Sequence, residues 1–185
     1  MKPSVATHKL FGRRDIVRAT KRLAPDAARL VDGSVPGRMP RIEVTVTTTR
    51  GMAELAAAAD VALAGGVVDS RTRSRAERDA RRTARESAGR AAALPDGGVL
   101  ILLNAEQHHS ADEVAVTLVH ELTHAMQFSR RGVRERMTGH LRDALGIARQ
   151  TRRAQREHLR LLAQEEAEAY AAEHLATQLT SAAAA

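Results

Sequence analysis

The sequence contains no cysteine among its 185 residues. The fold therefore uses no disulfide, and any bound metal must be held by histidine, aspartate or glutamate. The absence of cysteine fits either redox environment, so it does not indicate a compartment. Aromatic residues are also scarce, at 2% against 43% hydrophobic residues overall. Alanine, leucine and valine must consequently supply most of the core.

Long apolar runs are missing as well. The first 15 residues carry basic side chains but no apolar run of seven or more, which excludes a secretory signal of the usual kind. No stretch approaches the roughly 18 apolar residues of a membrane span. We expect a cytoplasmic protein with no membrane partner, while signal-independent export stays open. The length suits a single domain, with a first lobe over residues 1–129 and a helical lobe over residues 130–185.

Negative charge is scarce in two segments of a chain whose net charge is +7. Residues 71–90 carry eight arginines against three acids, and residues 130–160 carry ten against three, so the remainder has a net charge of −5. Such basic segments can dock nucleic acid or an acidic protein, although a solvated helix face gives the same pattern. No aromatic residues alternate with these arginines, which argues against a platform for stacking single-stranded bases.

Hydrophobic periodicity predicts several elements. Residues 42–47 alternate apolar and polar side chains, as a half-buried strand does. Residues 52–64 predict a helix, and residues 71–93 predict a long arginine-rich helix or a flexible basic arm. The continuous apolar run VLILLN, residues 99–104, predicts a buried strand.

A well-defined helix should follow this strand. Ser110 and Glu113 have the spacing of a capping box, which predicts a helix from about residue 111 to residue 128. Its core-facing stripe falls on every fourth residue: Val114, Leu118, Leu122 and Met126. Residues 134–180 are predicted to be mostly helical, with breaks near Gly139 and Gly146.

The predicted helix over 111–128 carries the motif His120-Glu121-Leu122-Thr123-His124. Residues four apart on a helix share one face, so His120 and His124 can direct their imidazoles at one zinc ion. Glu121 is rotated by about 100° from His120, which suits a general base acting on a water rather than a ligand. Two ordinary histidines on a helix are the alternative.

A catalytic zinc needs a third protein ligand and an open position. The elongated HExxHxxGxxH form is excluded because Gln127 and Arg130 occupy its glycine and last histidine positions. His140 and Asp143 remain candidates without other support. The helix predicted over residues 162–176 carries several carboxylates among small apolar residues, a costly arrangement unless something pairs with them. A metal would do so.

The segment TLVHELTHAMQ, residues 117–127, preceded by a strand and followed by a distant helix with Glu-x-x-Ala, resembles the gluzincin group of zinc metallopeptidases. The resemblance covers roughly residues 97–129 and 160–177. It implies that a strand runs along the substrate cleft, and that the second helix supplies a glutamate ligand. Glu166 in Glu166-Ala167-Glu168-Ala169-Tyr170 matches this ligand best. A weaker likeness, in YAAEHL, is to regulator-cleaving peptidases of the ImmA/IrrE type.

Further expectations follow from this resemblance. The VLILLN strand would be the edge strand on the substrate side, with Asn104 and the histidines at 108 and 109 near the cleft, unless these belong to a plain polar loop. Glu165 competes with Glu166 as the ligand, and otherwise should behave as a surface residue. Tyr170 lies one turn after Glu166, where its hydroxyl could bond a ligand histidine or polarise a substrate carbonyl, unless it is a core aromatic.

Together these features predict an α+β, zincin-like fold: a small twisted sheet packed on the active-site helix, with a helical C-terminal lobe. The expected function is hydrolysis of peptide or protein substrates by a Zn²⁺-activated water. His120, His124 and Glu166 would hold zinc, Glu121 would be the base, and Tyr170 would assist. Two alternatives stay open: a basic module that binds nucleic acid or an acidic protein, with a structural or vestigial zinc site, and a peptidase that cleaves a DNA-bound regulator.

Overall fold

A computed structural model describes residues 2–181 and contains a four-stranded mixed sheet with strand order β1-β2-β4-β3. Strands β1 (Ser4–His8), β2 (Ile42–Thr47) and β4 (Val99–Asn104) are parallel. Strand β3 (Gly89–Ala93) pairs antiparallel with β4 and forms one edge. The prediction for residues 42–47 is confirmed, and β2 alternates buried and half-buried side chains along most of its length.

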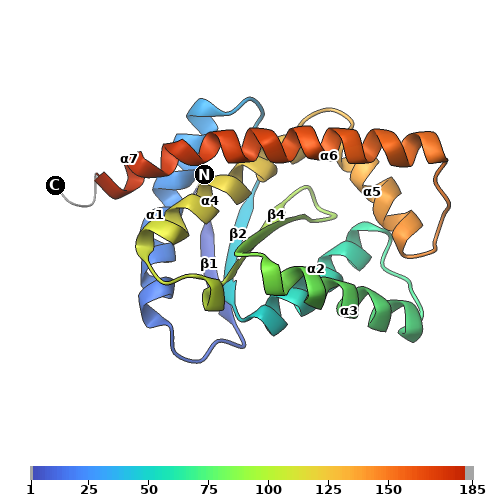
Figure 1. Ribbon diagram of the computed structural model, residues 1–185, viewed down its shortest axis with the longest axis horizontal. Helices are drawn as coiled ribbons and strands as arrows, with labels where there is room; N and C mark the ends of the chain where they lie inside the picture. The colour runs from blue at the N-terminus through green and yellow to red at the C-terminus, as the bar shows by residue number, and fades with distance from the viewer. Residues whose placement is uncertain (1, 182–185) are drawn as a thin grey trace.

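Helices cover both faces of the sheet (Figure 1). Helices α1 (Arg14–Ser34) and α4 (Ala111–Phe128) pack against one face, where they enclose Ile101 and Leu103 of β4. Helices α2 (Thr49–Leu63) and α3 (Ser70–Glu86) form the layer on the other face, around Leu100 and Leu102. Residues 99–103 of this strand are all apolar because both of its faces are covered.

The remaining chain is helical: α5 (Val133–Ala144), α6 (Arg152–Ala172) and α7 (Ala176–Ser181), with short 3₁₀ turns η1 (Ala105–Gln107) and η2 (Glu173–Leu175). The predicted break near Gly146 is confirmed, because this glycine follows α5 with a φ of 71°. The break near Gly139 is wrong, since Gly139 lies inside α5. No helix of the described residues has both the length and the apolarity that crossing a membrane requires.

Strand β3 corrects two expectations. The arginine-rich helix ends at Glu86, and the last part of the predicted 71–93 helix is this strand. Because β3 covers β4, the VLILLN strand lies inside the sheet and is not an edge. The sequence GRAAA gives no strand signal, since glycine and alanine are both depleted in strands. Pairing with β4 supplies what local propensity lacks.

Helix α4 begins as its capping box predicts. The Ser110 side chain accepts a hydrogen bond from the Glu113 N–H at 3.2 Å, and the Glu113 carboxylate accepts one from the His109 N–H at 2.5 Å. This start fixes the helix register, and the apolar stripe of α4 is fully buried between α1 and the sheet. The opposite side of α4, which carries the histidines, therefore faces α6 and the free edge of β3.

Candidate metal centre

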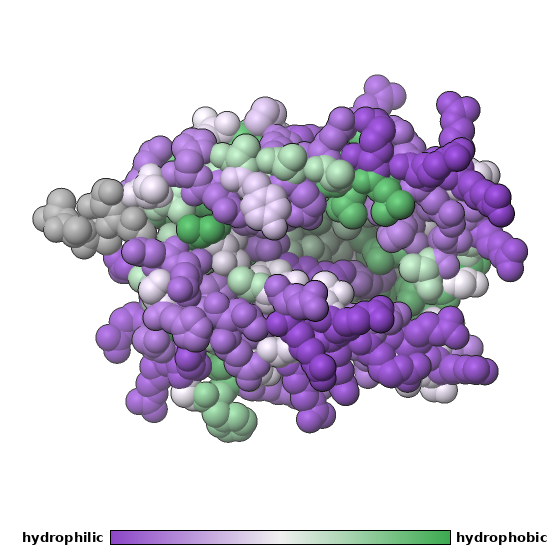
Figure 2. All heavy atoms as spheres, viewed as in Figure 1, coloured by the Kyte–Doolittle hydropathy of each residue, from purple (hydrophilic) through white to green (hydrophobic). Residues whose placement is uncertain are grey.

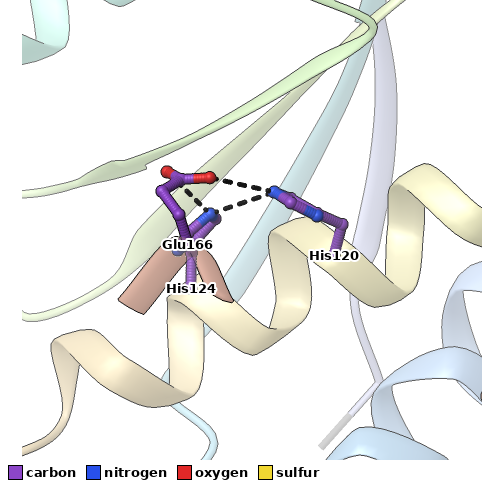
Figure 3. A group of neighbouring side chains, drawn as sticks. All are labelled: His120, His124 and Glu166. Atoms are coloured by element: carbon purple, nitrogen blue, oxygen red, sulfur yellow. Dashed lines mark hydrogen bonds and ion pairs between the residues drawn. The ribbon is translucent and has the colours of Figure 1, made fainter. Parts of the chain in front are cut away.

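The structure brings together His120 and His124 of α4 with Glu166 of α6 (Figure 3). The two Nε2 atoms lie 3.2 Å apart. The Glu166 carboxylate places one oxygen 3.4 Å from His124 Nε2 and the other 3.6 Å from His120 Nε2. Two histidines four positions apart and a glutamate 42 positions after the second thus bring their donor atoms close together.

These separations can be compared with those of a zinc site. Tetrahedral zinc with bonds of about 2.0–2.1 Å holds neighbouring donor atoms about 3.3 Å apart. The two Nε2 atoms, 3.2 Å apart, lie close to that value, and each Nε2 has a different Glu166 oxygen at 3.4 or 3.6 Å. The group supplies three protein donors, which leaves a fourth position for water or substrate. Two imidazoles and a carboxylate are also a donor set that zinc accepts without cysteine.

Both imidazoles are oriented by hydrogen bonds at their other nitrogen. His120 Nδ1 lies 2.9 Å from a Glu173 carboxylate oxygen, and His124 Nδ1 lies 2.8 Å from the Gln127 amide oxygen. Oxygen acceptors at these positions require a proton on Nδ1, which leaves the Nε2 lone pair free for a metal. Sequence analysis missed Glu173 and Gln127 as partners, although Gln127 lies only three residues after His124.

Gln127 also connects α4 to α6. This buried side chain donates from Nε2 to the Glu165 carbonyl oxygen at 2.8 Å and to the Glu168 carboxylate at 3.1 Å. Glu168 in turn accepts two hydrogen bonds from Arg130, at 2.7 and 2.6 Å. The orientation of His124 therefore depends on a polar network that spans both helices.

Glu121 points from α4 toward the edge strand and does not belong to the group of three donors. Its side chain is buried, with the residue 6% exposed. A Cβ added to Gly89 would lie 2.8 Å from the Glu121 carboxylate and 2.5 Å from a Thr117 methyl group, so only glycine lets β3 come this close. Burial raises the pKa of Glu121, although the His124 and His120 charges and the Ala91 N–H act in the opposite direction.

The electrostatics of the centre favour a cation. A hydrogen bond with His124 holds the pKa of Glu166 below its usual range, against the effect of burial. Burial lowers the pKa of His124, but its hydrogen bond to Glu166, the Glu121 charge and the Gln127 contact together raise it above the ordinary value. The carboxylates of Glu121, Glu166 and Glu173 thus surround two imidazoles, and positive charge between them would offset their repulsion.

Tyr170 lies beside His120, but not in the role of its hydrogen-bond partner. The rings meet edge to face with centroids 4.9 Å apart, and Tyr170 is 64% exposed. Within the described part of the chain, its hydroxyl makes no hydrogen bond. The core-aromatic interpretation is therefore wrong, and Glu173 rather than Tyr170 bonds the imidazole of His120.

Asn104 and His108 do not reach the cavity, contrary to the cleft interpretation. Asn104 is fully buried and donates to the Ala84 carbonyl oxygen at 3.1 Å. His108 is buried between the Asn104 carbonyl oxygen, at 2.7 Å, and the Thr117 hydroxyl, at 2.9 Å. Asn104 joins β4 to the end of α3, and His108 joins the end of β4 to α4, so both roles are structural.

The centre opens into a cavity of about 800 Å³ between the edge of β3, helix α4 and helices α5 and α6. Figure 2 shows the corresponding hollow in the middle of the visible face. Gly89 and Ala91 of β3 line one side, next to Glu121. Beyond His124 the lining becomes apolar, with Phe128, Met137, Leu141 and Leu162.

His158 lines the α5 end of the same cavity and gives a pH prediction. Burial, with the charges of His140 and Arg136, lowers the pKa of His158 to about 4. Arg136 donates to His158 Nδ1 at 3.0 Å, and the His140 ring stacks at 3.9 Å, so both contacts suit a neutral ring.

Between pH 6.5 and 4 the unfolded chain binds a proton at His158 that the folded chain rejects. The contribution of neutral His158 to the free energy of unfolding is therefore fully present above the unfolded pKa. It should fall by as much as about 3 kcal/mol as the pH drops toward 4. His158→Asn keeps an acceptor for Arg136 but cannot titrate. Thermal unfolding of both proteins across this range should show a flatter pH dependence for the variant. Parallel curves would contradict the assignment.

Comparison with protein-family models, with curated protein sequences and with solved structures found no match. Any functional assignment consequently depends on the geometry of the centre and its cavity.

Proposed function

We propose that this protein is a zincin-like metallopeptidase, in which His120, His124 and Glu166 hold zinc. The proposal is carried by one observation: His120, His124 and Glu166, from two helices, bring one donor atom each within 4.8 Å of one another beside a buried glutamate. Zinc bound there would lower the pKa of a water toward neutrality and polarise a carbonyl group.

Glu121 is the proposed general base. Its carboxylate lines the cavity next to the centre without belonging to the donor group. There it can accept the proton of the attacking water and pass it to the leaving amine. Burial raises the pKa of this carboxyl, which helps it to hold a proton between the two transfers.

The edge of β3 offers backbone groups for an extended substrate. The Asn104 N–H donates to the Ala88 carbonyl and the Leu94 N–H donates to the Gly98 carbonyl, so even-numbered residues of this strand pair with β4. In an antiparallel ladder the intervening residues, Gly89 and Ala91, direct their N–H and C=O groups away from β4. The Ala91 N–H is directed at Glu121, so the groups left for a substrate are the Gly89 N–H and the two carbonyl oxygens. A peptide added to this edge would pass directly beside Glu121.

Tyr170 is proposed to assist at the mouth of the cavity. Its ring is positioned by the edge-to-face contact with His120, and its exposed hydroxyl can donate to the oxygen of a substrate carbonyl. Of the two roles expected from the sequence, a bond to a ligand histidine and polarisation of a substrate carbonyl, the surroundings of Tyr170 support the second.

Zinc analysis is the direct test. The purified protein should contain about one zinc ion per chain. A chelator should abolish hydrolysis of a fluorogenic peptide library, and added zinc should restore it. The double variant His120→Ala/His124→Ala should lack the metal while His109→Ala, at an exposed position outside the cavity, keeps it. Equal zinc content in the double variant and the wild type would exclude this centre.

A further inference from the structure

Large hydrophobic side chains that remain exposed gather around the cavity. Of the six in the described residues, Val116, Leu162 and Tyr170 line the cavity, and Leu159 lies one helical turn from Leu162. Leu159 is 61% exposed and Tyr170 64%. Solvent-exposed apolar residues clustered in this way mark a surface that another molecule covers.

Three of these residues form one ledge on α6. Leu159, Leu162 and Tyr170 lie at helical spacing on the face that also carries Glu166, and we call them the α6 ledge. Helix α6 buries only His158, Ala169 and Ala172 along its 21 residues, so nothing in the described chain covers the ledge. The ledge is continuous with the metal centre, because Glu166 lies between Leu162 and Tyr170.

Charge around the cavity is unevenly distributed. At the centre, Glu121, Glu166 and Glu173 contribute carboxylates. At the other end, α6 begins with exposed arginines, and α3, whose last turn lines the opposite rim, carries several more. Several of these arginines, among them Arg75, Arg78, Arg152 and Arg156, are in no ion pair with any described residue. Figure 2 shows the most hydrophilic side chains above and below this end of the hollow.

We infer that the cavity accepts an extended, acidic polypeptide segment with an apolar residue between its acidic residues and the cleaved bond. The assignment of a cleaved bond rests on the proposed function, whereas the binding preference does not. Leu162 and Leu159 lie about 6 and 10 Å along α6 from Glu166, and Arg156 lies about 15 Å away. At about 3.3 Å per residue, the apolar side chain falls two or three residues from the bond and the acidic ones four to six residues from it.

A polypeptide fits this surface better than a nucleic acid does. The β3 edge presents peptide hydrogen-bonding groups, and the ledge presents two leucines with a single aromatic ring, whereas a run of stacked bases needs several rings. The carboxylates around the centre would also repel phosphate groups. The arginines are confined to one end, which matches a segment that is acidic only in part.

Binding is measured with zinc-loaded Glu121→Gln protein, so that no peptide is consumed. Fluorescein-labelled peptides carry a leucine next to a run of glutamates, glutamines or lysines, and their affinities are compared by fluorescence anisotropy. The glutamate peptide should bind about tenfold more tightly than the glutamine peptide at low salt, and the lysine peptide most weakly. Replacing the leucine by serine should weaken binding by about tenfold.

Charge exchange tests whether the arginines cause this preference. Arg152→Glu/Arg156→Glu should reverse the order of the glutamate and lysine peptides, whereas Arg22→Glu, on an exposed turn of α1 outside the cavity, should leave it unchanged. The comparison of the three peptides on Glu121→Gln protein needs no surface variant. It therefore tests the charge preference even if the double variant fails to fold.

Equal affinity for the three charge series overturns the inference. The inference is also overturned if duplex DNA displaces the labelled glutamate peptide at a lower concentration than the unlabelled glutamate peptide does. The arginines would then bind phosphate groups. A wild-type protein that shows the preference but cleaves none of the peptides leaves the inference standing and contradicts the proposed peptidase. Cleavage without any charge preference would support the proposed peptidase and contradict the inferred preference for acidic segments.

Discussion

Replacing Glu121 by glutamine should lower peptide hydrolysis by about a thousandfold or more, with zinc content near that of the wild type. The amide has nearly the same shape but cannot accept the proton of the attacking water. Because the three metal-directed donor atoms belong to other residues, the binding group stays complete. Thermal stability should be equal or higher, since burial already disfavours the ionised carboxyl, as its raised pKa indicates.

Hydrolysis is measured with a fluorogenic peptide library, and zinc content is measured by elemental analysis of the same preparation. Glu135→Gln is the matched control, because Glu135 is exposed on α5 and does not line the cavity. Hydrolysis by Glu121→Gln at a rate near that of the wild type would show that another group accepts the proton.

The second large effect concerns two adjacent glutamates of α6. Glu166→Ala should weaken zinc binding by more than about a hundredfold, because loss of a partner outside the ligand set already costs about 10–100-fold. Glu165→Ala should keep the metal, since its carboxylate pairs with Arg136 and not with the histidines. A competition titration with a zinc chelator compares the two variants directly. Metal loss in Glu165→Ala and retention in Glu166→Ala would assign the ligand to the neighbouring position.

Glu165 does not behave as the surface residue expected from the sequence. It and Arg136 are 16% and 13% exposed at their side chains, so the ion pair is largely withdrawn from water. Its removal leaves a nearly buried guanidinium with one partner fewer, which should cost about 2 kcal/mol of unfolding free energy. The two alanine variants are therefore expected to fail differently, one in metal affinity and the other in thermal stability.

The parts of this protein that sequence analysis predicted depend on neighbours within one or two helical turns. The capping of α4 by Ser110 and the shared face of His120 and His124 are of that kind. Strand β3 was missed because alanine and glycine carry no strand propensity, and its pairing depends on residues about ten positions later. Glu173 was missed for a similar reason: its bond to His120 exists only once α6 has crossed α4.

Asn104 and His108 are residues for which the sequence left two interpretations open. Polar residues after a buried strand resemble cleft residues in a sequence, yet here their polar atoms are bonded to α3, to the backbone of β4 and to α4. Whether a polar side chain is available for binding depends on its partners, and those are a property of the folded chain.

The sparse burial of α6 has a consequence for how the centre is assembled. With only three buried residues, this helix is held to α4 largely by Gln127, by the Arg130–Glu168 pair and by Glu166 itself. An ion bound as proposed would cross-link the two helices, and its binding free energy would add to the stability of their docking. The contacts between α4 and α6 would then both shape the cavity and complete the ligand set. Formation of the cavity and binding of the ion would be thermodynamically coupled.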